Sequence, residues 1–185
     1  SFGLQLNFSC PNVGLHAEEL VQEVGVALQV AGELGIPLVP KFNLLLPVEA
    51  AIEIAEKPNC DAIVVSNTIP WGALSDRIPW KKMFGTEESP LKHLGGGGLS
   101  GKPLLPLVIE WIEKARDKGL RKPVNAGGGI LSANDARDVL RAGADGISIG
   151  SAVILRPWRV PEIVNAAIEF DAKTFQRKPA VPEAV

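Results

Sequence analysis

Short runs of apolar residues alternate along this chain with longer segments in which apolar residues recur every three or four positions. The short runs are typical of strands and the longer periodic segments of amphipathic helices. The pattern predicts five strands, at residues 4–8, 38–42, 62–66, 123–126 and 146–149. It predicts helices after each of them, at residues 18–35, 47–56, 104–118, from 132 onward and 161–176.

Strands that alternate with helices imply right-handed crossovers and a parallel sheet, and continuous apolar strands imply burial on both faces. Five strand–helix units fit either an open five-stranded sheet or part of a barrel. A closed (β/α)₈ barrel needs about 250 residues, whereas this chain has 185. Polar residues follow the carboxyl end of every predicted strand, and function at that single rim is typical of barrels. The sequence therefore predicts an α/β fold, a partial barrel of the TIM type with about five units.

The domain organisation is expected to be simple. One barrel-like domain is predicted over residues 1–177 and a disordered tail over 178–185, while residues 69–102 are expected to be irregular. The chain begins with Ser1 and shows no charged-then-apolar leader. We expect either a missing N-terminal half or association with a second copy, because an incomplete barrel leaves a strand edge open.

Composition narrows the class of protein. The formal net charge is −2 with no basic block, which argues against a nucleic-acid or anionic membrane partner. No apolar run is long enough for a transmembrane segment. Cys10 and Cys60 have neither metal-ligand spacing nor the density of a disulfide framework, so a cytoplasmic location without a metal site is expected.

Two glycine-rich turns follow the last two predicted strands. Gly127-Gly128-Gly129 precedes a helix that Ser132 and Asp135 cap, and Gly150-Ser151 ends the final strand. Glycines let the backbone approach an anion closely, and a helix N-terminus offers unpaired amides. Either turn alone could be an ordinary tight turn, but the pair at this spacing predicts a phosphate-binding cup.

The first predicted strand ends in an unusual cluster of polar residues, which we call the Asn-Cys-Asn lip. Cys10 stands there between Asn7 and Asn12, with Pro11 ending the strand. A thiol has a pKa of about 8.5, so it needs modest help to act as a general base. The neighbouring carboxamides provide hydrogen bonds to a polar ligand.

These signatures resemble the C-terminal portion of dihydroorotate dehydrogenases, flavin enzymes of pyrimidine synthesis built on the (β/α)₈ barrel. The matching segments occur in the family's order: Asn7-Phe8-Ser9-Cys10-Pro11-Asn12, Lys41, Ser66-Asn67-Thr68, Gly97 to Pro103, Gly128-Gly129-Ile130 and Ile149 to Ala152. The Cys motif together with the Leu-Ser-Gly-Lys-Pro loop is the specific part of this match.

The resemblance implies a role for each position. Cys10 matches the base that removes a proton from carbon 5 of dihydroorotate while a hydride leaves carbon 6 for flavin mononucleotide (FMN). The residues that match substrate contacts are Asn7, Asn12, Asn67 and Thr68. The residues that match FMN contacts are Lys41, Ser66, Ser100, Gly101, Gly128, Gly129, Gly150 and Ser151, and Lys41 stabilises the reduced flavin.

Two alternatives stay open from the sequence. A flavin-free barrel enzyme acting on a sugar phosphate would use the same cup without the Asn-Cys-Asn lip. A non-catalytic remnant domain would keep the fold alone. The chain also departs from the family: Pro40 is expected to shorten or distort the second strand, and Trp71 or Trp80 either lines the site or docks the long loop. The Cys10 motif matches the soluble branch of the family, whereas the Leu-Ser-Gly-Lys-Pro loop at residues 99–103 matches the membrane-associated branch. Quinone, fumarate and NAD therefore all remain candidate electron acceptors.

Overall fold

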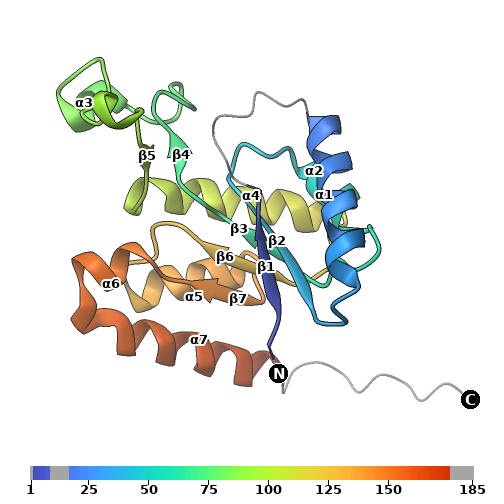
Figure 1. Cartoon of the computed structure of the whole chain (residues 1–185). Helices are drawn as coiled ribbons and strands as arrows, with labels where there is room; N and C mark the ends of the chain where they lie inside the picture. Colours follow the sequence, from blue (N-terminus) through green and yellow to red (C-terminus); the bar gives the residue numbers. More distant parts are fainter. Residues whose placement is uncertain (1, 9–16, 176–185) are drawn as a thin grey trace, which may run out of the picture.

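A five-stranded parallel sheet forms the centre of the structure, a computed structural model that describes residues 2–8 and 17–175. The spatial order of the strands is β1-β2-β3-β6-β7, which matches their order along the chain (Figure 1). Their bounds are Leu4–Asn7, Leu38–Phe42, Ile63–Val65, Val124–Gly127 and Gly146–Ser148. The predicted parallel sheet is thus confirmed, with strand ends within two residues of the expected ones.

Helices cover the sheet along its outer face, as Figure 1 shows. They are α1 (Ala17–Gly32), α2 (Val48–Ala55), α4 (Leu105–Asp117), α5 (Ala133–Arg141), the short α6 (Ser151–Leu155) and α7 (Val160–Phe175). Phe42, Ile63 and Ile112 are fully buried between the strands and these helices. No helix in the described part of the chain is both long and apolar enough to cross a membrane.

The sheet does not close into a barrel. Within the described residues, β1 and β7 each pair with one neighbouring strand and form the two edges. Apolar side chains are exposed on the helical segments that follow both edge strands: Val26 and Val30 on α1 after β1, and Ile154, Trp158 and Ile168 in the residues after β7. These exposed faces are what a partial barrel is expected to leave open, so the predicted architecture is confirmed.

The segment between β3 and α4 is less irregular than expected. Two short strands within it, β4 (Ile69–Pro70) and β5 (Gly98–Leu99), pair in antiparallel register. Between them lie helix α3 (Trp80–Phe84) and a 3-10 turn at Lys92–Leu94. Figure 1 shows that this segment, residues 69–102, which we call the excursion, lies beyond the carboxyl end of β3.

The aromatic residues of the excursion pack against one another. The ring of Trp71 lies 4.8 Å from that of Trp80 and 4.9 Å from that of Phe84, measured between centroids. The Trp80 indole also donates to the carbonyl of Ala73 at 2.8 Å. The two tryptophans therefore dock the loop onto itself.

Pro40 does not shorten its strand, which spans Leu38–Phe42, so the expected shortening was wrong. The amide of Leu38 faces β3, because it donates to the Asp61 carboxylate at 2.8 Å. Amides alternate in direction along a strand, so the missing N–H of Pro40 falls on the same side. Pairing with β3 begins only at Lys41, opposite Val64, and the proline therefore costs the sheet no ladder hydrogen bond.

A second proline also differs from the prediction. Pro47 was expected at the first position of its helix, but it is the N-cap residue, with an extended backbone. The short helix α6, directly after the Gly150-Ser151 turn, was not predicted. Five residues are too few for helical periodicity to be recognised in a sequence.

Candidate functional site

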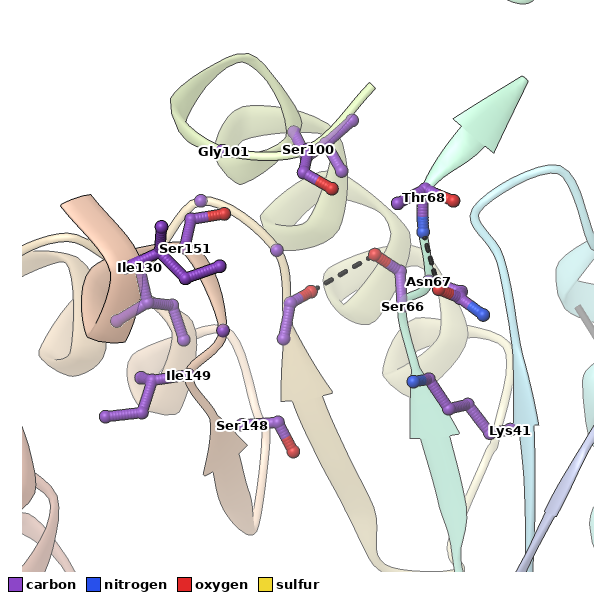
Figure 2. A pocket seen from close by; sticks show the side chains of 16 residues that line it. Lys41, Ser66, Asn67, Thr68, Ser100, Gly101, Ile130, Ser148, Ile149 and Ser151 are labelled. Atoms are coloured by element: carbon purple, nitrogen blue, oxygen red, sulfur yellow. Dashed lines mark hydrogen bonds between the residues drawn. The ribbon is translucent and has the colours of Figure 1, made fainter. Parts of the chain in front are cut away.

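A pocket of about 410 Å³ opens at the carboxyl ends of the strands. All eight residues predicted to contact a cofactor line it, and Figure 2 shows the side chains of Lys41, Ser66, Ser100 and Ser151 among them, on separate segments of the chain. They are Lys41, Ser66, Ser100, Gly101, Gly128, Gly129, Gly150 and Ser151. The end of β2, the loops after β3, β6 and β7, and the excursion thus meet at one site, as the rim pattern of the sequence predicts.

The Gly128–Gly129 turn is shaped so that only glycine fits. Both residues have positive φ angles, 114° and 79°, which other residues rarely adopt. A Cβ atom at Gly129 would lie 2.7 Å from the carbonyl oxygen of Gly101 and 2.9 Å from the amide nitrogen of Leu105. The turn after β6 therefore packs directly on the Ser100–Gly101 turn, with space for a ligand and none for a side chain.

Hydroxyl groups surround these glycine turns. A Cβ atom at Gly101 would lie 3.9 Å from the Ser151 hydroxyl, so the turn after β7 reaches the same place. The Ser66 hydroxyl donates to the Gly127 carbonyl at 3.2 Å, which ties the end of β3 to the end of β6. Glycine amides and serine hydroxyls at a helix N-terminus are the chemistry that binds a phosphate group.

Helix α5 begins beside this cup. Its N-cap Ser132 accepts a hydrogen bond from the Asp135 amide at 3.3 Å, as the capping pattern predicts. The Asp135 carboxylate accepts from the Leu131 amide at 2.9 Å and from the Lys102 ammonium at 2.5 Å. Burial alone raises the pKa of Asp135, but these hydrogen bonds outweigh it and hold the pKa below its ordinary value.

Lys41 supplies a positive charge to the pocket. It is half-buried in β2 and lies in register with Asn7 on β1 and Val64 on β3. Figure 2 shows its amine reaching toward the centre of the pocket. A cation there favours a ligand that carries or gains negative charge.

Three of the four predicted substrate residues, Asn7, Asn67 and Thr68, lie at the same rim. Asn67 and Thr68 line the pocket, and the Asn67 carboxamide donates to that of Asn7 at 3.4 Å. Asn67 in turn accepts from the Thr68 amide at 2.9 Å, which fixes the orientation of its side chain (Figure 2). Cys10 and Asn12 lie outside the described residues.

Several lining residues were missed by the sequence analysis. Leu104, Ile130, Ile149 and Ile154 add apolar wall, and Ser148 adds a hydroxyl. Ile130 and Ile149 lie within the matched motifs but were given no role, whereas Leu104 and Ser148 directly neighbour a motif and Ile154 follows Ser151 by three residues. Extending every motif by one turn would have found them. The other cysteine, Cys60, is buried and outside the pocket; burial raises the pKa of its thiol to about 11, which keeps it neutral.

The chain matches known proteins along most of its length. The family model described as dihydroorotate dehydrogenase matches residues 3–170. The chain is 31% identical over 175 residues to "Dihydroorotate dehydrogenase B (NAD(+)), catalytic subunit" of Thermodesulfovibrio yellowstonii, covering 90% of this chain and 54% of that protein. It is 33% identical over 159 residues to "Dihydroorotate dehydrogenase A (fumarate)" of Lactobacillus delbrueckii subsp. bulgaricus, covering 80% of this chain and 47% of that protein.

A solved structure supports the fold. The ligand-free DHODH of Eimeria tenella superposes with a TM-score of 0.64 at 22% identity, covering 95% of this chain and 55% of that one. The chain spans about half the length of the curated relatives it matches. With a family model that matches nearly its whole length, the chain belongs to the dihydroorotate dehydrogenase family.

Proposed function

We propose that the protein oxidises dihydroorotate to orotate with FMN as hydride acceptor, a reaction of pyrimidine synthesis in the cytoplasm. One observation carries the proposal. The eight residues that resemble the family's FMN contacts come from distant parts of the sequence, yet all of them line one pocket. The loops after parallel strands meet at one rim in any barrel, so the support for FMN lies in what meets there: glycine turns, serine hydroxyls and a lysine in one pocket.

The residues of the pocket fit FMN. A volume of about 410 Å³ is within the range of about 300–1,000 Å³ that small-molecule sites occupy. The glycine turns and the hydroxyls of Ser66, Ser100 and Ser151 suit the phosphate, and Lys41 suits the flavin ring. When bound, FMN would supply the acceptor for a hydride.

The chain's own residues supply the remaining chemistry. Cys10 resembles the family's base, and as a thiolate it would take the proton from carbon 5 of dihydroorotate while the hydride leaves carbon 6. Removal of one proton and one hydride converts the substrate to orotate, so atoms and electrons balance. Asn7, Asn12, Asn67 and Thr68 would hold the pyrimidine ring and its carboxylate in place. The Asn7–Asn67 hydrogen bond supports this set, because it links the end of β1 to the segment after β3, both of which would contact the substrate.

A spectroscopic titration tests the proposal. The 185-residue chain alone is expected to bind FMN weakly or not at all, because it spans about half the length of its relatives. The full-length native protein that contains this chain is therefore purified and titrated with FMN, and binding is followed by the quenching of flavin fluorescence. We expect saturable binding, followed by anaerobic bleaching of the flavin bands and formation of orotate when dihydroorotate is added. A protein that binds inorganic phosphate or a sugar phosphate but not FMN would support the flavin-free alternative, and one that binds none of them would support a remnant domain.

A further inference from the structure

Asp135 is a buried carboxylate next to the phosphate cup. Among the described residues it is the only charged residue that is buried, with 7% of its surface exposed. A buried charge is costly unless it is paired and hydrogen-bonded. Both of its oxygens are engaged: Oδ1 accepts from the Lys102 ammonium at 2.5 Å and Oδ2 from the Leu131 amide at 2.9 Å. An exposed carboxylate would serve equally well to cap the helix. The burial of Asp135 therefore needs another explanation.

The Lys102–Asp135 pair joins the two loops that form the cup. Lys102 directly follows the Ser100–Gly101 turn, and Asp135 belongs to the helix that follows the Gly128–Gly129 turn. These turns are in direct contact, because a Cβ atom at Gly129 would meet the Gly101 carbonyl. The ion pair therefore links the segments that directly follow the two turns, and it limits how far the turns can move apart.

Lys102 does not itself line the pocket. More than half of its side-chain surface is exposed, and its ammonium is directed at Asp135. This geometry distinguishes a lysine that positions the loop from a lysine that contacts the ligand.

We propose that Lys102 and Asp135 are positioning residues that hold the two glycine turns at the spacing the FMN phosphate requires. The inference rests on the proposed function, since it assigns the cup to that phosphate. Because the pair acts through the backbone, removal of either partner has the same effect on cofactor affinity. A direct contact between Lys102 and the phosphate would have a different consequence, since loss of Asp135 would then release the lysine and leave binding unchanged or tighter.

The test compares FMN affinity across four variants: Lys102→Met, Asp135→Asn, the double variant that carries both, and Lys102→Arg. We expect about tenfold weaker FMN binding in the first three, from the loss of a charged hydrogen bond, and nearly wild-type affinity with Arg, which keeps the charge. The double variant leaves no unpaired buried charge, so it keeps the test valid if a single variant fails to fold. The matched control is Lys118→Met, since Lys118 pairs with the exposed Glu49 at the opposite end of α4.

Amide hydrogen exchange provides a second readout that does not need a cofactor. We expect faster exchange at residues 99–104 and 128–131 in Lys102→Met and in the double variant, and no change there in Lys118→Met. Unchanged FMN affinity in the paired variants, or weaker binding in Lys102→Met but not in Asp135→Asn, overturns the inference. If the wild-type protein binds no FMN, the proposed function fails, and the positioning role is judged by hydrogen exchange alone. Equal amide exchange rates at residues 99–104 in Lys102→Met and Lys118→Met would then overturn the positioning role as well.

Discussion

The carbonyl oxygen of Gly101 lies 2.7 Å from the position that a Cβ atom would take at Gly129. The two glycines are far apart in the sequence and belong to different loops, yet their backbones leave no room for even a methyl group. This contact defines the floor of the candidate cofactor site. It also makes the site sensitive to the smallest substitution.

We expect Gly129→Ala to weaken FMN binding about tenfold or more, because the added methyl must push the two turns apart, at the cost of an overpacked contact. Gly129→Asp adds charge repulsion toward the phosphate and should abolish binding. Fluorescence titration with FMN measures both effects.

Gly119→Ala is the matched control for this prediction. Gly119 also has a positive φ, 98°, but a Cβ atom there would meet nothing within 4 Å. Both alanine variants thus carry backbone strain, and only Gly129→Ala carries a clash at the cup. Equal FMN affinity in the two variants would mean that the contact with Gly101 does not shape the site.

Strand positions were predictable because apolar runs and prolines are local signals, and 38–42 was placed without error. The glycine turns were predictable because their conformation requires that residue type. The Lys102–Asp135 pair was not, because 33 residues separate its partners and no local pattern links them. The β4–β5 pairing was missed for a related reason: each strand has two residues, too few to show a period.

Arg116 on α4 is expected to stabilise the end of the sheet opposite the pocket. Its guanidinium donates to the carbonyls of Gly143, Leu120 and Lys122 at 2.9, 2.7 and 2.9 Å, and to the Asp145 carboxylate at 2.6 Å. Arg116→Met removes all four bonds and should lower the free energy of unfolding by about 3 kcal/mol. Urea denaturation followed by circular dichroism measures this change.

Lys118→Met serves as the reference for Arg116→Met. The Lys118–Glu49 pair is exposed on both sides, and such pairs contribute about 0–1 kcal/mol. We expect its urea midpoint to stay near the wild-type value. A loss of stability as large as that of Arg116→Met would show that charge on α4, and not the bonds to the loops, is responsible.

The Asp135 carboxylate predicts a pH dependence of stability. Its pKa is lowered in the folded protein from an ordinary value of 3.8. The stabilisation it provides is therefore fully present above about pH 4 and is lost as the pH falls through the lower folded value. The difference in unfolding free energy between the wild-type protein and Asp135→Asn should be constant from pH 5 to 7 and shrink below pH 4. A difference that grows on acidification would contradict this assignment.

The most direct test of the central claim is the rate at which dihydroorotate bleaches FMN bound to the full-length protein that contains this chain, measured by anaerobic stopped-flow. With Cys10→Ala we expect unchanged FMN affinity and a rate of flavin reduction slower by about 10²–10⁴-fold, the usual effect of a lost general base. Asn67→Ala should mainly raise the dihydroorotate concentration needed for half-maximal reduction, because its role is to position the substrate. Bleaching by Cys10→Ala at the wild-type rate, or no bleaching of the wild-type protein by dihydroorotate, would contradict the account.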